Sequence, residues 1–266
     1  MKVAHILRFV FNPLLLRLQL GEGGITLFNT VHCWLATHNP LLTTGCTALS
    51  LLTLCALYGF NDYIDRHRDA QNPKKHQPFV ALINEHNKAF LITNALLSAA
   101  LVLTALAFYG TTQAASLLLL LGINCIYSLR LKTLPLADIV IVTLWGSAIT
   151  LLVPVIHLPL SLVAGIMTGI AHIYQMLGDK ESDTQNGVTT AITRYPKTAS
   201  VQILLLCLLL GVSIYWLRQN ILWSATAVLP FVCYYLIKKN ETAWLFSRLY
   251  FAIVWLMLLY NTYGGN

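Results

Sequence analysis

Nine stretches of the sequence are apolar over about the length that an α-helix needs to cross a lipid bilayer. A bilayer core takes roughly 20 apolar residues per helix, or about 17 at the short end. The stretches cover residues 24–38, 41–60, 89–109, 113–128, 135–153, 159–177, 199–217, 221–237 and 243–262. They are continuous rather than alternating in polarity, which disfavours a β-barrel. Only 10% of the residues are charged, against about 25% in soluble domains. We therefore expect an all-α integral membrane protein with nine transmembrane helices.

Lysine and arginine cluster at alternate ends of these stretches, which are the ends that would lie on one side of a membrane. Most of them lie in the N-terminal arm and after the second, fourth, sixth and eighth stretches, with Arg218 as the exception on the opposite side. The positive-inside rule then predicts a cytoplasmic N-terminus and a C-terminus outside. This pattern explains the net charge of +7 without a nucleic-acid partner. The expected location is a bacterial inner membrane.

The N-terminal arm, residues 1–23, mixes Lys and Arg with Leu and Phe. This composition predicts a helix that lies at the membrane interface against lipid. The arm shows no cleavable signal peptide, because it contains Pro13 and no small-residue cleavage site. The six cysteines are dispersed without a CxxC pair. We interpret them as packing residues rather than as metal ligands or disulfide partners.

Six of the ten acidic residues fall in two short segments on the predicted cytoplasmic side. The first segment holds Asp62, Asp65 and Asp69, and the second holds Asp179, Glu181 and Asp183. If the helix of residues 41–60 continues, Asn61, Asp65 and Asp69 recur at every fourth position, with Asp62 beside them on the same face. In the second segment Asp179 and Asp183 share a face, whereas Glu181 points to nearly the opposite side.

Like charges on one helix face repel each other, and burying them is costly unless a cation offsets the repulsion. Mg²⁺ takes oxygen ligands and is often held by a few carboxylates together with phosphate oxygens of a substrate. The paired acidic faces therefore favour a magnesium–diphosphate site. Solvated loop charges are the plainer alternative, but the spacing repeats at two distant positions.

Three motifs together resemble the UbiA-type intramembrane prenyltransferases. "NDYIDRHRD" (61–69) is similar to the family's NDxxDxxxD motif. "DKESD" (179–183), followed by "NGVTTAITRYPKTA", is similar to its second DxxxD motif with a GxxT tail. "YSLRLKTLPLADIV" (127–140) is similar to its YSxxLK segment. The motifs occur in the right order, and the resemblance covers most of the chain from about residue 41 onward.

This resemblance implies a single domain over residues 1–266, with nine helices around a central cavity. The acidic motifs would lie in cytoplasmic cap loops, residues 61–88 and 178–198, so the active site would face the cytoplasm. By resemblance, Asn61, Asp65, Asp179 and Asp183 would hold Mg²⁺ on an isoprenyl diphosphate, supported by Asp62 and Asp69. We count Asp65, Asp69 and Asp183 among the candidate catalytic residues.

Ionisation of an allylic diphosphate separates a carbocation from a highly charged leaving group, which metal ions and fixed cations stabilise. The candidate diphosphate-binding residues are Arg130, Lys132, Lys74, Lys75 and Arg194. The alternative for each of them is an ordinary basic residue that follows the positive-inside rule. Tyr127 is a further candidate catalytic residue. Its ring could stabilise the allylic cation, or it could belong to the belt of tyrosines at the membrane interface.

Three residues are candidates for an acceptor pocket. His172 and Gln175 share a helical face with Asp179, at spacings of seven and four. His172 equally fits a packing residue. Asp138 is an intramembrane ionisable group, which makes it a functional candidate by default. The alternative is that Asp138 pairs with a neighbouring cation and only orients it.

We predict an enzyme that transfers an isoprenyl group from its diphosphate, with Mg²⁺, to an aromatic or other lipophilic acceptor in the membrane. Gln77 stands where many family members have an Arg before Pro, so one diphosphate contact differs from the family pattern. A terpene cyclase of the same fold needs the same groups and stays an alternative. "DAQNPKK" (69–75) resembles the polyprenyl-phosphate phosphoribosyltransferase branch, but the full second DxxxD favours prenyl transfer. An ion-coupled transporter is disfavoured because the acidic residues lie at span ends.

Overall fold

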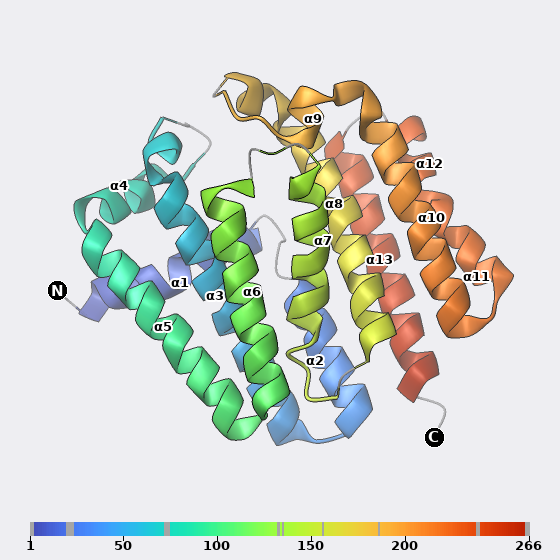
Figure 1. The fold of residues 1–266 in the computed structure, drawn as a ribbon, viewed down its shortest axis with the longest axis horizontal. Helices are drawn as coiled ribbons and strands as arrows, with labels where there is room; N and C mark the ends of the chain where they lie inside the picture. The colour runs from blue at the N-terminus through green and yellow to red at the C-terminus, as the bar shows by residue number, and fades with distance from the viewer. Residues whose placement is uncertain are drawn as a thin grey trace. The chain divides into compact units, whose positions relative to one another are not determined.

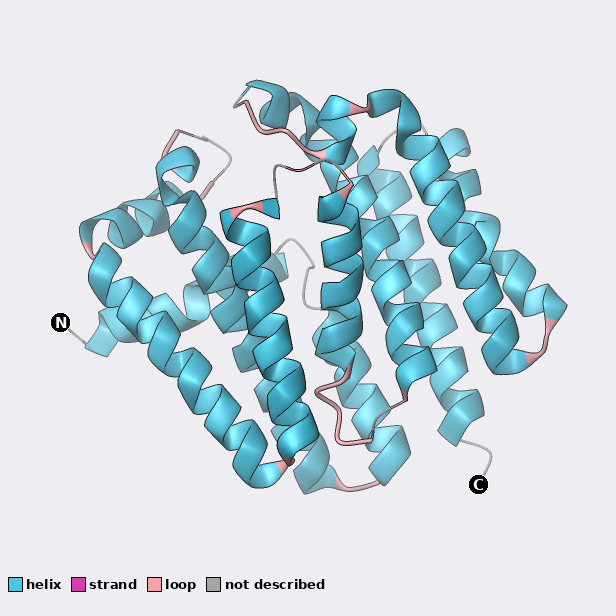
Figure 2. Cartoon of the chain, viewed as in Figure 1, coloured by secondary structure: helices cyan, strands magenta, loops and turns pink. Residues whose placement is uncertain are grey.

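The computed structural model describes residues 3–19, 24–71, 75–131, 134, 136–155, 157–185, 187–237 and 240–263. All regular secondary structure in these ranges is helical (Figures 1 and 2). This confirms the all-α prediction. The chain divides into two compact units, Met1–Leu129 with Leu152–Val155, and Arg130–Leu151 with Ile156–Asn266.

The first unit is built around one long helix, α3. Its helices are α1 (Val3–Gln19), α2 (Gly24–Thr37), α3 (Pro40–Asp69), α4 (Gln77–Glu85), α5 (Asn87–Phe108) and α6 (Thr111–Leu129). Helix α3 packs against each of the other five. Its central place follows from its sequence, because apolar and small side chains cover it on several faces rather than along a single stripe.

Helix α3 begins at a capping residue and continues beyond the predicted apolar run. The Asn39 side chain accepts a hydrogen bond from the Leu42 backbone N–H at 3.0 Å, and Pro40 occupies the first turn, where its missing N–H costs nothing. The helix then continues beyond the apolar run to Asp69. This confirms the helical continuation on which the shared face of Asn61, Asp65 and Asp69 depends.

The second unit has α8 at its centre. Its elements are α7 (Ala137–Thr150), α8 (Leu158–Gln185), α9 (Ala191–Arg194), η2 (Pro196–Thr198), α10 (Ala199–Arg218), α11 (Ile221–Ala225), η3 (Thr226–Val228), α12 (Leu229–Leu236) and α13 (Asn240–Tyr263). Helix α8 packs against α7, α9, α10 and α13. The central helix of each unit therefore carries one of the two acidic motifs at its C-terminal end.

Small residues bring α7 and α8 into close contact. A Cβ atom added at Gly146 would lie 2.5 Å from the Thr168 Cβ, and one added at Gly165 would lie 2.5 Å from the Thr143 carbonyl oxygen. Two helices can approach this closely in a membrane only where side chains are small, and close packing is a main source of helix association there.

Six helices in the described part of the chain are long and apolar enough to cross a membrane: Pro40–Asp69, Asn87–Phe108, Thr111–Leu129, Leu158–Glu181, Pro196–Arg218 and Thr242–Tyr263. The other three predicted spans coincide with shorter segments, namely α2, α7 and the interrupted run α11–η3–α12. Pro230 lies in the first turn of α12, directly after the 3₁₀ turn that interrupts this last run.

Candidate functional site

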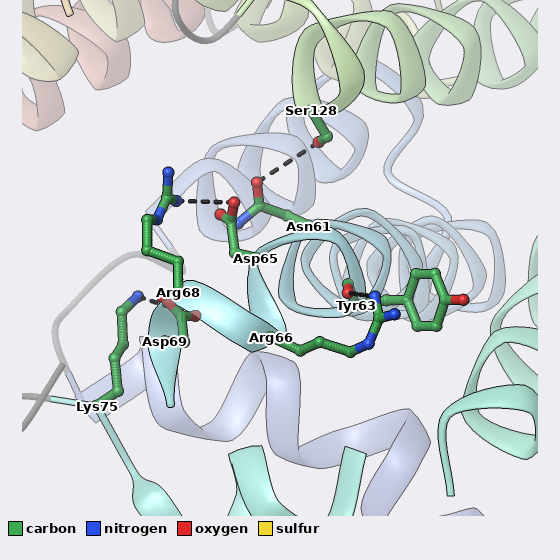
Figure 3. Close-up of polar contacts among 8 residues, drawn as sticks. All are labelled: Asn61, Tyr63, Asp65, Arg66, Arg68, Asp69, Lys75 and Ser128. Carbon is green, nitrogen blue, oxygen red and sulfur yellow. Dashed lines mark hydrogen bonds and ion pairs between the residues drawn. The ribbon is translucent and has the colours of Figure 1, made fainter. Parts of the chain in front are cut away.

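The first acidic motif lies at the C-terminal end of α3 (Figure 3). Asp62 is 8% exposed, Asp65 8% and Asp69 6%. Three carboxylates this deeply buried on one helix would be costly without positive charge to offset them. The first acidic motif is thus a cluster of buried, negatively charged side chains.

Two of these carboxylates are paired with cations from nearby in the sequence. Arg68 Nη2 lies 2.7 Å from Asp65 Oδ1, one turn along the helix. Lys75 Nζ lies 3.7 Å from Asp69 Oδ2, and Figure 3 shows both cations reaching toward the carboxylates. Gln77 Nε2 donates to the Asp69 backbone carbonyl at 3.1 Å. Gln77 therefore helps to hold the segment after the motif against the end of α3.

Arg66 is directed away from Asp65 and Asp69 (Figure 3). Its Nη1 donates to the Tyr63 carbonyl at 2.6 Å, and its guanidinium lies over the Tyr63 ring, 4.3 Å from the centroid. Figure 3 shows this pair on the opposite side of the helix from Asp65. The two arginines of this motif thus differ in role, because Arg68 pairs with a carboxylate whereas Arg66 stacks on Tyr63.

Helix α6 contacts the start of the motif. Ser128 Oγ donates to Asn61 Oδ1 at 3.5 Å, so the YS segment of α6 reaches the first residue of the motif on α3. Tyr127, the preceding residue, is half-buried. Tyr127 therefore lies on α6 at the level of the first acidic motif.

Two asparagines hold α3 one turn before the motif. Asn94 Nδ2 on α5 donates to the Ala56 carbonyl at 2.9 Å, and Asn124 Nδ2 on α6 donates to the Leu57 carbonyl at 3.1 Å. Gly59 makes room for this contact, since a Cβ there would lie 2.5 Å from Asn94 Nδ2. Because α5 and α6 each hydrogen-bond to one of two consecutive carbonyls of α3, they fix the rotation of α3 about its own axis. They thereby fix the direction of its acidic face. Our sequence interpretation missed both asparagines, although an amide inside an apolar span is a usable signal.

The second acidic motif lies in the last two turns of α8. Asp179 and Glu181 are exposed and Asp183 is half-buried. The motif is therefore more open to solvent than the carboxylates of α3. Along the same helix, His172 is half-buried and Gln175 is exposed.

Asp138 is bound to the backbone. It is 1% exposed, its Oδ1 accepts from the Ile139 N–H at 2.8 Å, and its Oδ2 accepts from the Ala191 N–H at 2.9 Å. These bonds use both carboxylate oxygens within the protein. The geometry favours a structural attachment for Asp138 over contact with an acceptor.

The candidate cations differ in how far the structure describes them. Lys75, Arg130 and Arg194 are exposed, and Lys75 pairs with Asp69. Lys74 and Lys132 lie outside the described residues.

Within the described ranges, no three His, Cys, Asp or Glu side chains gather closely enough to form a metal centre. The donor chemistry of α3 nevertheless fits a hard divalent cation, which prefers carboxylate and amide oxygens and takes further ligands from phosphate. Two of the carboxylates already attract a side-chain cation. The first motif therefore has the kind of ligands, although not by itself the number, that Mg²⁺ uses.

Comparison with known proteins decides the family. The UbiA prenyltransferase family matches residues 26–248, which is most of the chain. The chain belongs to the UbiA prenyltransferase family. The match includes both acidic motifs and the YSxxLK-like segment, so it confirms the resemblance noted in the sequence. With six long apolar helices, this UbiA family member is an integral membrane protein. No curated protein matched the chain.

Solved structures share the fold at low sequence identity. A UbiA homolog from Archaeoglobus fulgidus bound to GPP and Mg²⁺ has a TM-score of 0.69 and 13% identity, covering 98% of this chain and 99% of that one. A UbiA homolog from the same organism bound to DMAPP and Mg²⁺ has a TM-score of 0.66 and 15% identity, covering 88% and 94%. A digeranylgeranylglyceryl phosphate synthase structure has a TM-score of 0.62 and 13% identity, covering 89% and 92%. The chain therefore has the UbiA-like fold.

Proposed function

We propose that this UbiA family member transfers an isoprenyl group from an isoprenyl diphosphate to an aromatic or other lipophilic acceptor in the membrane, with Mg²⁺ as cofactor. The observation that carries the proposal is the set of three buried carboxylates at the end of α3. Proteins of the same fold with GPP or DMAPP and Mg²⁺ bound support it, as does one with Cd²⁺ bound.

Oxygen ligands from both acidic motifs would hold the metal and the diphosphate. The proposed metal ligands are Asn61, Asp62, Asp65, Asp179 and Asp183. The basis is their oxygen chemistry and their match to the family motifs. Since Arg68 and Lys75 now pair with α3 carboxylates, substrate binding would replace a side-chain cation with a metal ion.

Exposed cations would neutralise the remaining charge of the diphosphate. We assign this role to Arg130, Lys132, Lys74, Lys75 and Arg194. Lys75 supports the assignment best, because it already lies beside Asp69 and is 43% exposed in its side chain. A partly exposed cation close to the acidic motif can also bind the diphosphate as its charge rises.

In the reaction, the bond between the allylic carbon and the diphosphate oxygen breaks, and the electron pair leaves with the diphosphate. Bound Mg²⁺ supplies Lewis-acid stabilisation of that leaving group. Tyr127 presents its ring to the allylic cation, which an aromatic face stabilises through its quadrupole. The acceptor then bonds to the allylic carbon and loses a proton. His172 and Gln175 of α8 are the proposed acceptor contacts.

The proposed topology has nine spans, a cytoplasmic N-terminus and an active site facing the cytoplasm of a bacterial cell. The distribution of Lys and Arg supports this orientation. We propose that the three shorter helical segments cross or line the membrane within the family fold, and that α1 lies at the interface. Exposed Leu7, Phe11 and Leu15 on α1 support that placement.

The experiment is diphosphate release by the purified protein from geranyl, farnesyl and geranylgeranyl diphosphates, with and without Mg²⁺ and with a lipid extract as acceptor source. We expect release that requires Mg²⁺, with a prenylated product that appears only when extract is present. A cyclic product formed without extract would indicate a cyclase. Absence of release from every donor, with and without extract, would contradict the proposal.

A further inference from the structure

Asp138 is a buried carboxylate that the proposed reaction does not use. It lies in the first turn of α7, two residues after Leu136, whose φ of 74° is unusual for a residue with a side chain. Its two oxygens accept hydrogen bonds from the Ile139 and Ala191 N–H groups, and Ala191 lies 53 positions further along the chain. A carboxylate near a helix N-terminus is electrostatically favourable, but the bond to Ala191 reaches a different element.

Ala191 needs an acceptor from outside its own helix. It is the first residue of α9 and is 0% exposed. The N–H of a first helical residue has no partner within the helix, and a buried N–H without a partner is costly. Asp138 supplies the acceptor, at 2.9 Å and with a charged oxygen. Such charge-assisted bonds are stronger than neutral ones.

Backbone and threonine bonds connect this attachment to the second acidic motif. The Val188 N–H donates to the Asp183 carbonyl at 2.8 Å, and Thr193 Oγ1 donates to the Val188 carbonyl at 3.1 Å. Thr190 and Thr193 close a capping box at the start of α9. The segment 187–194 is therefore held at one end by Asp183 and at the other by Asp138.

We propose that Asp138 is a positioning residue that anchors the segment 187–194, and so holds Asp183 and Arg194 where they act on the diphosphate. This inference rests on the proposed function for the roles of Asp183 and Arg194. The anchoring itself does not depend on it. Asp138 touches no substrate in this account and acts only through the segment that it binds.

Amide hydrogen exchange in detergent tests the anchoring without any substrate. In Asp138→Ala the Ala191 amide loses its charged acceptor, and exchange across 187–194 should accelerate by about 10- to 100-fold, the range for a lost bond to a charged group. Asp138→Asn keeps one accepting oxygen for two N–H donors and should lie between wild type and Ala. It also supplies the comparison if Asp138→Ala does not fold.

The matched control is Asn220→Ala. Asn220 caps α11 by accepting from the Leu222 and Trp223 N–H groups, so this variant removes the same kind of side-chain-to-backbone attachment from the same unit. It should leave exchange across 187–194 unchanged. Unchanged exchange there in Asp138→Ala, or acceleration spread evenly over the whole chain, would overturn the anchoring.

The link to catalysis is tested by steady-state kinetics with geranyl diphosphate and Mg²⁺. We expect Asp138→Ala to raise KM for the diphosphate by about tenfold with a smaller change in kcat, because a displaced segment weakens binding, and Asp138→Asn to recover part of the loss. Faster exchange with an unchanged KM would overturn the positioning role. If the wild-type protein released no diphosphate, the proposed function would fail, while the exchange data would still decide the anchoring.

Discussion

Substitutions in the Asp65–Arg68 pair can distinguish a structural role of the first motif from a catalytic one. The substitution Asp65→Asn removes the negative charge but keeps the size and shape of the side chain. It breaks the 2.7 Å ion pair with Arg68 and also removes the negative charge of the proposed metal ligand. Arg68→Gln breaks the same ion pair from the other side and leaves the carboxylate in place. The two variants therefore differ in whether position 65 still offers a charged oxygen to a metal ion.

The structure sets the size of each effect. The Arg68 side chain is 32% exposed, so Asp65→Asn leaves an arginine that water can solvate and should cost about 0–1 kcal/mol of folding free energy. Arg68→Gln leaves the buried Asp65 carboxylate without its cation and should cost more, up to about 3–5 kcal/mol. Loss of one preorganised electrostatic group from a transition state costs about 2.7–4 kcal/mol, or about 10²- to 10³-fold in kcat. Asp65→Asn should therefore lose most of its activity while unfolding at nearly the temperature of wild type.

The assay is Mg²⁺-dependent diphosphate release, alongside thermal unfolding of each variant in the same detergent. We expect Arg68→Gln to keep a kcat within about tenfold of wild type, since the Asp65 carboxylate is still present to bind the metal ion. If Arg68→Gln lost as much activity as Asp65→Asn, Asp65 would matter only as the partner of Arg68. The reasoning that makes it a metal ligand would then be refuted.

Three further predictions concern stability and the metal. Gly59→Ala should destabilise the fold by about 1–3 kcal/mol, because its Cβ would lie 2.5 Å from Asn94 Nδ2, whereas Gly122→Ala, with open space around it, should be neutral or slightly stabilising in the same thermal unfolding assay. Asn124→Ala should lower the unfolding temperature by removing the bond to the Leu57 carbonyl, at a cost of about 1 kcal/mol; an unchanged temperature would show that α6 does not hold α3 there. Chelation with EDTA should abolish diphosphate release and added Mg²⁺ should restore it, and activity that survives chelation would rule out a metal cofactor.

The helical class, the six long spans and the extension of α3 were predictable because they depend on local patterns. Apolar runs of bilayer length specify helices wherever they occur, and the every-fourth spacing of Asn61, Asp65 and Asp69 has meaning only on a helix. The three shorter predicted spans show the limit of this approach. Hydropathy gives the extent of an apolar run, but not where Pro230 and the 3₁₀ turn before it interrupt the helix.

The contacts that support the motifs were not predictable from spacing. Asn94 and Asn124 bind carbonyls of α3 that are 38 and 67 positions away, and such long-range pairs depend on how helices pack. Asp138 illustrates the same limit. Its position inside an apolar span marked it as functional, but only the folded chain identifies the Ala191 N–H as its partner. The metal-ligand roles of both motifs remain predictions.

The central claim is that carboxylates of both acidic motifs act on one diphosphate with Mg²⁺, and the second motif tests it most directly. Asp179 and Glu181 are both exposed acids in the last two turns of α8, two residues apart, so replacing either with Ala removes the same charge from the same helix. The measurement is Mg²⁺-dependent diphosphate release by wild type, Asp179→Ala and Glu181→Ala. We predict that Asp179→Ala is inactive and that Glu181→Ala is close to wild type. Full activity in Asp179→Ala would contradict the account.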